Sequence, residues 1–209
     1  FGAVEETARK HGKRLAWNFV DDGIERTWSE VDALSRQTAA AFAKLGIKKG
    51  SHVGVLMPNV EAYPLTWIAL GRLGAVMVPV NIAYTPREVA YVLENAEATH
   101  LVVHSDMLPI YEQIEKAPVD GKNVIVVGAR SPRYGHFWPE TMDAAKGSTP
   151  PTVKVEPDNV SGPVIASPAF KTRVLSVPTS PVSPAPLPTN RPAVTVPAGI
   201  LMPEESLRL

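Results

Sequence analysis

The 209-residue sequence contains no cysteine, and this absence excludes several classes of protein at the outset. Disulfide-stapled scaffolds, thiolate metal sites and cysteine nucleophiles all require a residue that the chain lacks. An excess of charge of one sign is missing as well, because 21 basic residues balance 21 acidic ones. Nucleic-acid-binding proteins need surplus cations to neutralise phosphates, so the charge balance argues against that class.

Long hydrophobic runs are also absent. No uninterrupted apolar run approaches the roughly 20 residues that cross a bilayer, so we expect no transmembrane segment. The chain begins with Phe1, and a charged stretch follows at residues 5–10, so no secretory signal peptide is visible. The missing initiator methionine suggests a piece of a longer reading frame. We therefore expect a cytoplasmic protein.

Proline divides the sequence into two unequal regions. Eight of the 21 prolines lie within residues 1–149, and 13 lie within residues 150–209. Each proline removes a backbone donor and fixes φ, so neither a helix nor a central strand can run through the dense series at 178–192. We predict a folded body over residues 1–160 and a disordered, proline-rich tail over residues 161–209.

Two helix starts stand out in the body. Thr27 and Glu30 have the spacing of a capping box ahead of apolar positions with helical periodicity, and Gly46 follows where such a helix would end. Thr85 and Glu88 repeat the pattern, with proline at the first helical position. A third helix, between the first two predicted strands, is expected to start near residue 59 and to lose one early hydrogen bond at its proline.

Short apolar runs without alternation separate these helices, which is typical of strands buried on both faces. The runs are residues 53–57, 75–80, 101–103 and 124–127. Strands alternating with helices at this spacing predict consecutive βαβ crossovers. The fold class is therefore α/β, with a mostly parallel sheet flanked by helices.

Such a sheet usually binds its ligand at the carboxyl ends of its strands, but the sequence shows little chemistry there. Gly50 and Gly54 do not form a dinucleotide-binding pattern, and we interpret Gly50 as the turn into a strand. The segment from Gly128 to Arg130 follows a strand but opens no periodic helix, which favours a structural turn over a nucleotide site. No P-loop pattern occurs anywhere in the sequence.

Histidines and tryptophans provide the remaining candidates. His100 and His104 would share one face of a strand, with Asp106 nearby, and a metal site there is weighed against ordinary surface or loop histidines, which we favour. Trp28 and Trp67 lie at helical spacing among apolar residues, so we predict that they pack in the core. We assign no catalytic residue and no metal ligand, and the cofactor-binding residues stay unknown.

Five segments in the same order resemble adenylate-forming (AMP-binding) enzymes of the acyl-CoA synthetase type. They are TWSEV at 27–31, LGIKKGSHVGV at 45–55, MPNVE at 57–61, GRLGAVMVPVN at 71–81 and YTPREVAYVL at 84–93. The fourth is the most specific, because it is similar to the family's "GAVxVPLN" strand. The resemblance covers about residues 3–160 and implies the N-terminal portion of that fold.

For a complete enzyme, the resemblance implies a ligase of fatty acid metabolism that uses ATP, Mg²⁺ and coenzyme A. A small-molecule carboxylate and ATP give an acyl-adenylate and pyrophosphate, and coenzyme A then displaces AMP. The family's phosphate loop, "TSGTTGxPKG", is expected after residues 156–161, where this chain reads GPVIASP at 162–168. We likewise expect these 209 residues to lack the family's small C-terminal domain with its catalytic lysine. We expect an N-terminal fragment that binds no cofactor and is inactive alone.

The alternative is a non-catalytic interaction module that presents a proline-rich ligand. Residues 178–181 and 181–184 are PxxP steps that aromatic-lined grooves could dock. Reading the nucleotide sequence beyond the codon for Ser161 in the other two frames would separate the two hypotheses. A Gly/Thr-rich phosphate loop found there supports the fragment, and its absence favours a genuine tail.

Overall fold

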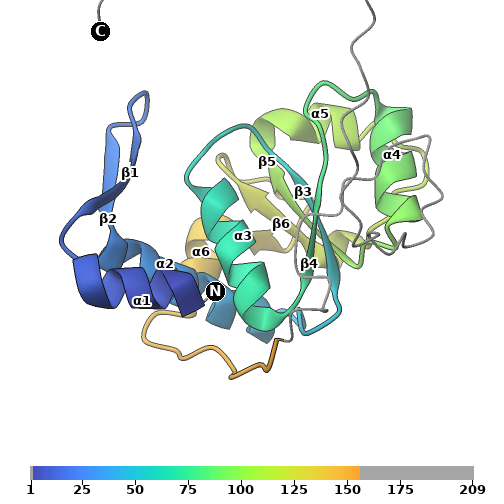
Figure 1. Ribbon diagram of the computed structural model, residues 1–209. Coiled ribbons are helices and arrows are strands. Elements are labelled where there is room, and N and C mark those ends of the chain that lie inside the picture. Colours follow the sequence, from blue (N-terminus) through green and yellow to red (C-terminus); the bar gives the residue numbers. More distant parts are fainter. Residues whose placement is uncertain (1, 156–209) are drawn as a thin grey trace, which may run out of the picture. The chain divides into compact units, whose positions relative to one another are not determined.

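In the computed structural model, which describes residues 2–155, five parallel strands form one sheet (Figure 1). The strands are β3 (His52–Leu56), β4 (Val76–Pro79), β5 (His100–His104), β6 (Val124–Val127) and β7 (His136–Phe137). Their order across the sheet is β4-β3-β5-β6-β7. The four apolar runs predicted as strands are thus confirmed, and β7 is a fifth that the sequence pattern did not indicate. The predicted tail (161–209), its PxxP steps and the last residues of the predicted body lie outside the described residues.

Helices cover both faces of this sheet, as the fold class requires (Figure 1). They are α2 (Trp28–Lys44), α3 (Ala62–Leu73), α4 (Pro86–Asn95), α5 (Leu108–Tyr111) and α6 (Trp138–Asp143), with short 3₁₀ turns at Ser105–Met107 and Gly121–Asn123. Side chains of α2, α3 and α6 belong to one apolar cluster against the sheet, and those of α4 and α5 belong to another. The predicted α/β architecture is confirmed.

Both predicted capping boxes are present. The backbone N–H of Thr27 donates to Glu30 Oε2 at 2.7 Å at the start of α2, and that of Thr85 donates to Glu88 Oε2 at 2.8 Å at the start of α4. These hydrogen bonds stabilise the charged carboxylates and lower the pKa of both glutamates. Gly46 lies just beyond α2 with a φ of 89°, which confirms its predicted place after the helix.

Helix α3 begins at Ala62, three residues later than the predicted start near Asn59. The chain first turns through the loop after β3, where Val60 N donates to Pro58 O at 2.9 Å. Pro64 is consequently the third helical residue, and the first four N–H groups of a helix have no intrahelical acceptor. The expected loss of a hydrogen bond at Pro64 is therefore wrong, because that position has none to lose.

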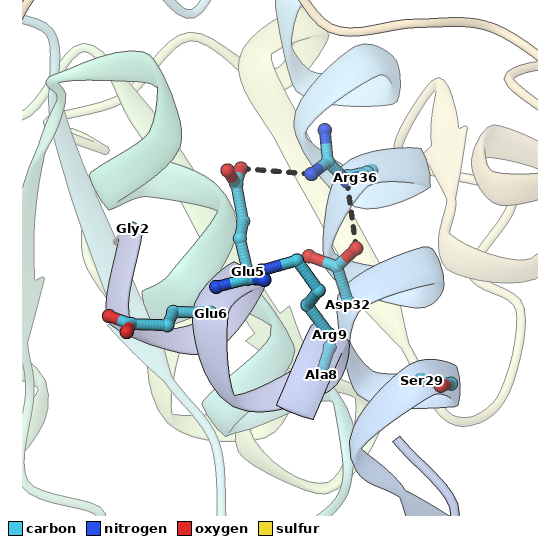
Figure 2. A pocket seen from close by; sticks show the side chains of 8 residues that line it. All are labelled: Gly2, Glu5, Glu6, Ala8, Arg9, Ser29, Asp32 and Arg36. Carbon is cyan, nitrogen blue, oxygen red and sulfur yellow. Dashed lines mark hydrogen bonds and ion pairs between the residues drawn. The ribbon is translucent and has the colours of Figure 1, made fainter. Parts of the chain in front are cut away.

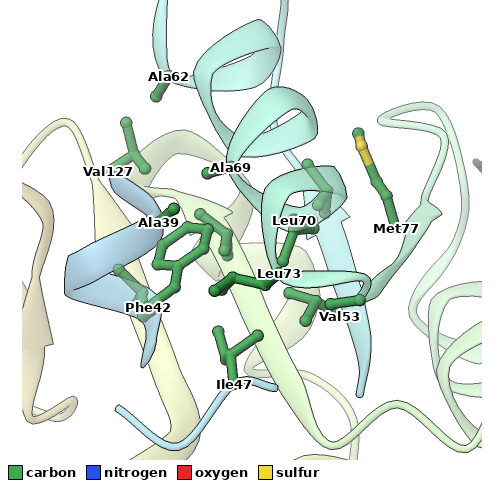
Figure 3. Packing of buried hydrophobic residues seen from close by; sticks show 14 of the residues in the cluster. Ala39, Phe42, Ile47, Val53, Ala62, Ala69, Leu70, Leu73, Met77 and Val127 are labelled. Carbon is green, nitrogen blue, oxygen red and sulfur yellow. The ribbon is translucent and has the colours of Figure 1, made fainter. Parts of the chain in front are cut away.

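The core consists of two clusters, one on each face of the sheet. On the first, Phe42 of α2 and Leu70 and Leu73 of α3 surround Val53 of β3, all fully buried (Figure 3). On the second, Val92 and Leu93 of α4 pack with further strand side chains such as Leu56, Leu101 and Val126. Alternate residues of one strand enter different clusters, so the inner positions of β3, β5 and β6 carry no polar side chain. This explains the unbroken runs in the sequence.

The amino-terminal arm, residues 2–27, has a different construction. It comprises α1 (Gly2–His11) and an antiparallel hairpin of β1 (Leu15–Phe19) and β2 (Ile24–Thr27). None of the residues of α1 is buried. Within the hairpin, Trp17 and Phe19 contact edge to face with their ring centroids 6.3 Å apart. The arm packs on α2 and does not extend the parallel sheet.

Within residues 2–155, no helix combines the length and the apolar character that a membrane span requires.

Candidate functional site

The topology of the sheet indicates where a ligand is expected. The chain passes from β3 to β4 on one side, and then from β4 to β5 on the other side of β3, so the strand order reverses beside β3. In open α/β sheets, ligand crevices lie outside the carboxyl ends of strands at such a reversal. The loops that begin at Met57, Val80, Ser105 and Gly128, after four successive strands, therefore form the candidate site.

A hollow of about 410 Å³ lies at the carboxyl ends of β3 and β4, and we call it the edge hollow. It is lined by Met57, Pro58, Asn59, Tyr63, Pro79, Val80, Asn81, Ile82 and Tyr84. None of these side chains carries a formal charge at neutral pH, and burial raises the pKa of Tyr63 further above its usual value. The edge hollow therefore suits apolar and neutral polar groups, and it lacks the cations that hold a phosphate.

A polar cluster occupies the neighbouring loops after β5 and β6. His104 Nδ1 accepts a hydrogen bond from the backbone N–H of Asp106 at 3.3 Å, and the same nitrogen lies 3.4 Å from Asp106 Oδ2. Ser105 Oγ accepts from the backbone N–H of Ala129 at 3.0 Å. These bonds join the two loops to each other, which leaves the Ala129 N–H committed to Ser105 rather than free for an anion.

Gly128 is required at this junction for a steric reason. Its φ is 87°, and a Cβ at this position would lie 2.7 Å from Ser105 Oγ and 2.8 Å from His104 Nε2. Arg130, two residues on, forms an ion pair with Glu140 of α6. The segment from Gly128 to Arg130 therefore has structural contacts throughout, which favours the structural interpretation over nucleotide binding.

The other glycine segment, Gly50–Gly54, begins at the amino end of β3, opposite the carboxyl ends of the strands. Gly50 has a φ of 80°, and its N–H donates to Gly74 O at 2.9 Å in the turn that leads into β3. Gly54 is inside β3, where a Cβ would lie 2.3 Å from Leu93 Cδ2. The predicted structural role of Gly50 is confirmed, and neither glycine faces the candidate site.

His100 and His104 mark the two ends of β5, so four residues of extended chain, about 13 Å at the usual rise, separate them. His100 Nε2 lies 3.2 Å from Leu45 O at the amino edge, and burial lowers the pKa of this imidazole. His104 belongs to the polar cluster at the carboxyl edge. The two rings cannot share one ion, and residues 2–155 contain no group of three His, Asp or Glu side chains arranged to hold a metal.

The prediction of core packing is wrong for Trp67, whose surface is 46% exposed, whereas Trp28 is half-buried. Helix α3 is apolar nearly all round, so its sequence pattern does not reveal which side faces outward. Leu65, Ala69 and Leu73 take the packed side, and Trp67 is left on the outer one.

A network of ion pairs between α1, α2 and α3 was not predicted from the sequence. Figure 2 shows its part between α1 and α2, where Arg36 contacts Glu5 and Asp32. Arg72 Nη1 lies 2.5 Å from Glu5 Oε1, and Arg72 Nη2 lies 2.6 Å from Asp32 Oδ1. Arg36 contacts the same two carboxylates at 3.0 Å and 2.9 Å. The i,i+4 spacing of Asp32 and Arg36 is the part of this network that the sequence could have indicated. The pair of Glu5 and Arg72 could not be predicted, because these residues are 67 positions apart in the sequence.

This network borders a hollow of about 710 Å³ between α1 and α2 (Figure 2). Four of the five charged side chains that line it are paired, since Glu5 and Asp32 contact both Arg36 and Arg72 and Glu6 contacts Lys10 at 2.5 Å; Arg9 is the fifth. The Arg72 side chain is only 6% exposed, but the Glu5 and Asp32 side chains are 45% and 20% exposed, so the carboxylates of these pairs stay in contact with water. We interpret the network as the attachment of α1 to the body rather than as a reaction centre.

Comparison with known proteins confirms the resemblance. A family model for AMP-binding enzymes matches residues 4–162. YngI of Bacillus subtilis (strain 168), whose name places it among acyl-CoA synthetases, is 34% identical over 100 residues, which is 48% of this chain and 18% of that protein. A crotonobetaine/carnitine–CoA ligase of Escherichia coli O139:H28 is 33% identical over 90 residues, or 43% of this chain and 17% of that one. The chain thus spans less than a fifth of these curated relatives.

Solved structures agree with these matches. A long-chain-fatty-acid–CoA ligase from Archaeoglobus fulgidus is 30% identical with a TM-score of 0.69, over 77% of this chain and 33% of that one. The N-terminal domain of FACL13 from Mycobacterium tuberculosis, at 22% identity, has the same fold with a TM-score of 0.62, over 75% of this chain and 38% of that one. The parallel sheet of the present chain is therefore that of the N-terminal portion of acyl-CoA ligases, and the chain belongs to the AMP-binding enzyme family.

Proposed function

We propose that the described body is the N-terminal scaffold of an acyl-CoA synthetase. The complete enzyme would join a small-molecule carboxylate to coenzyme A at the expense of ATP, releasing AMP and pyrophosphate. The observation that carries this proposal is the match to the ligase from A. fulgidus, which extends over 77% of this chain at 30% identity. That protein is named for long-chain fatty acids, so a role in fatty acid metabolism in the cytoplasm is part of the proposal.

The residues of the body do not fit ATP or Mg²⁺. A triphosphate needs converging N–H groups and cations, and Mg²⁺ prefers carboxylate ligands. The edge hollow is lined only by uncharged side chains, and the Ala129 N–H is bonded to Ser105 Oγ. We therefore propose that the residues present supply scaffold rather than catalysis.

We also propose that the 209-residue chain is inactive alone, with its body ending near Val160. Where the family pattern has its phosphate loop, the sequence reads GPVIASP at 162–168, and prolines lack the N–H groups that phosphates need. Limited proteolysis tests the boundary, because we expect the first cuts between residues 161 and 191 and a protected product near residues 1–160. Uniform resistance beyond residue 161 would contradict this boundary.

Carboxylate-dependent exchange of pyrophosphate into ATP tests the function. The 209-residue chain should give no exchange with any acid from short to long. A chimera in which residues 4–155 replace the matched third of the A. fulgidus ligase should give exchange with fatty acids, because the scaffold would then carry the remaining parts of the enzyme. The unmodified A. fulgidus ligase is the positive control.

The two arms of this test fail in different ways. A chimera that folds but gives no exchange would contradict the scaffold proposal. Exchange by the 209-residue chain alone would reveal a phosphate site within it, and the loops at Gly50–Gly54 and Gly128–Arg130 would then be the first to mutate.

A further inference from the structure

Apolar side chains gather on one surface at the carboxyl edge of the sheet. Trp67 of α3 is 46% exposed and Ile82, in the loop after β4, is 44% exposed. Ile82, Tyr63 and Tyr84 all line the edge hollow. Tyr63 and Trp67 are four residues apart on α3 and so lie on the same side of that helix. We call Tyr63, Trp67, Ile82 and Tyr84 the edge face.

The chemistry of this surface suits permanent cover by protein. None of the side chains that line the edge hollow is charged, so covering them does not require the costly desolvation of an unpaired ion. The polar groups present are amides and phenol hydroxyls, which can hydrogen-bond across an interface. Tyrosine and tryptophan are enriched at the centres of protein–protein interfaces, where charged residues are depleted.

Whatever binds to the edge face must also account for the exposure of Trp67. A small molecule that filled the edge hollow would leave this indole exposed, because Trp67 does not line the hollow. A polypeptide surface can cover both the hollow and the adjoining turn of α3. Such a polypeptide is available in the relatives, since this chain covers only 33% of the A. fulgidus ligase and two thirds of that protein lie outside the match.

We propose that the edge face is the docking surface for the part of an AMP-binding ligase outside the matched third. This inference rests on the proposed function and adds to it the surface through which the scaffold joins the rest of the enzyme. The contact is apolar and uncharged at its centre, with Trp67 and Ile82 as its exposed anchors.

Association in trans tests the docking surface. The 209-residue chain is mixed with the remaining two thirds of the A. fulgidus ligase, and the dissociation constant is measured by titration and size-exclusion chromatography. Trp67→Asp and Ile82→Asp should each weaken binding about tenfold or more, as loss of an interface anchor does. Tyr91→Asp is the matched control, because Tyr91 is 41% exposed on α4, away from the edge face, and should leave binding unchanged.

The outcomes separate this inference from the proposed function. A complex that forms and is indifferent to both edge-face substitutions overturns the docking surface while leaving the scaffold proposal intact. The wild-type chain could instead fail to bind the remainder of the ligase and form a dimer that Trp67→Asp abolishes. The edge face would then bind a second copy of this chain, and the inference would be wrong. The chimera assay then decides the proposed function on its own. Unfolding curves of each variant serve as the control, and they should match the wild type because these positions are exposed.

Discussion

The parallel sheet and the amino-terminal arm are held together by different forces. In the sheet, β6 is buried along its whole length and Val53 and Leu101 are inaccessible to solvent. In the arm, α1 has no buried residue and is joined to α2 and α3 by the ion pairs of Glu5. Apolar burial stabilises by about 25 cal/mol per Å² and involves no charges that salt can screen. Exposed ion pairs contribute about 0–1 kcal/mol each and are screened by it.

The parallel sheet and the amino-terminal arm should therefore be open to separate destabilisation. Substitutions in the sheet should change the free energy of global unfolding. Changes of ionic strength or of single charges should act mainly on the arm, whose opening need not expose the core.

Truncating a core side chain should give the largest effect. Ile125 of β6 is fully buried in the cluster under α2 and α3, so Ile125→Ala removes apolar contacts and leaves a cavity. We expect a loss of about 2–5 kcal/mol in the free energy of unfolding, measured by urea denaturation. Leu15→Ala, at a position 54% exposed on β1, should change it by less than about 0.5 kcal/mol. Equal effects at the two sites would contradict the contrast between sheet and arm.

Adding one carbon inside the sheet should give the next largest effect. In Gly54→Ala the new Cβ would lie 2.3 Å from Leu93 Cδ2 and 3.1 Å from Leu101 Cδ1, so the buried Leu93 side chain must move from its place between α4 and β3. We expect a loss of about 1–3 kcal/mol from this overpacking, measured in the same way. Gly135→Ala is the matched control, because nothing lies within 4 Å of its added Cβ. A neutral Gly54→Ala would mean that α4 packs less tightly than described.

Removing the charge of Glu5, but not that of its neighbour Glu6, should weaken the attachment of the arm to the body. Glu5→Gln removes the charge that pairs with Arg36 and Arg72. Glu6→Gln removes a charge that, within residues 2–155, pairs only with Lys10 inside α1. We expect Glu5→Gln to speed amide hydrogen exchange in α1 severalfold, while global stability falls by no more than about 1 kcal/mol. High salt should raise exchange in the wild type toward the Glu5→Gln level. Equal exchange in the two variants would show that the ion pairs do not hold α1.

Acid should produce the smallest effect, through His100. Burial lowers the pKa of this imidazole below its ordinary value of 6.5, with a further lowering from the charge of His136 and an opposing effect of the hydrogen bond to Leu45 O. The unfolded chain therefore takes up the proton more readily than the folded one. This contribution to stability is complete above the ordinary pKa and declines as pH falls below it.

The free energy of unfolding, measured between pH 7.5 and pH 5, tests the direction of this pH dependence. The wild type should lose stability toward the acid end, and His100→Gln should lose less. His11→Gln, at the exposed end of α1, is the control and should keep the slope of the wild type. A slope unaffected by His100→Gln would assign the acid sensitivity to other groups.

Much of the sheet could be predicted because its signals are local. Thr27 and Glu30, or Thr85 and Glu88, mark a helix start within four residues. An unbroken apolar run identifies a doubly buried strand without knowledge of its neighbours. Hence strands β3–β6 and helices α2–α4 were predicted correctly, apart from the start of α3. Strand β7, helices α5 and α6 and the amino-terminal arm were not predicted.

The candidate site could not be predicted in the same way, because its features depend on distant contacts. Ser105 meets Ala129 only when β5 and β6 lie side by side, and Glu5 meets Arg72 only when α1 crosses α2 and α3. The orientation of Trp67 depends on which side of an almost wholly apolar helix faces the sheet. No sequence pattern carries that information.

The strand order described for the sheet also bears on how the chain is made. The inner strand β3 is synthesised first, β4 then takes one side, and β5, β6 and β7 add on the other side in chain order. Each newly emerged strand from β4 onward therefore finds its partner already made. The sheet can grow outward during translation, without waiting for a distant strand to complete its interior.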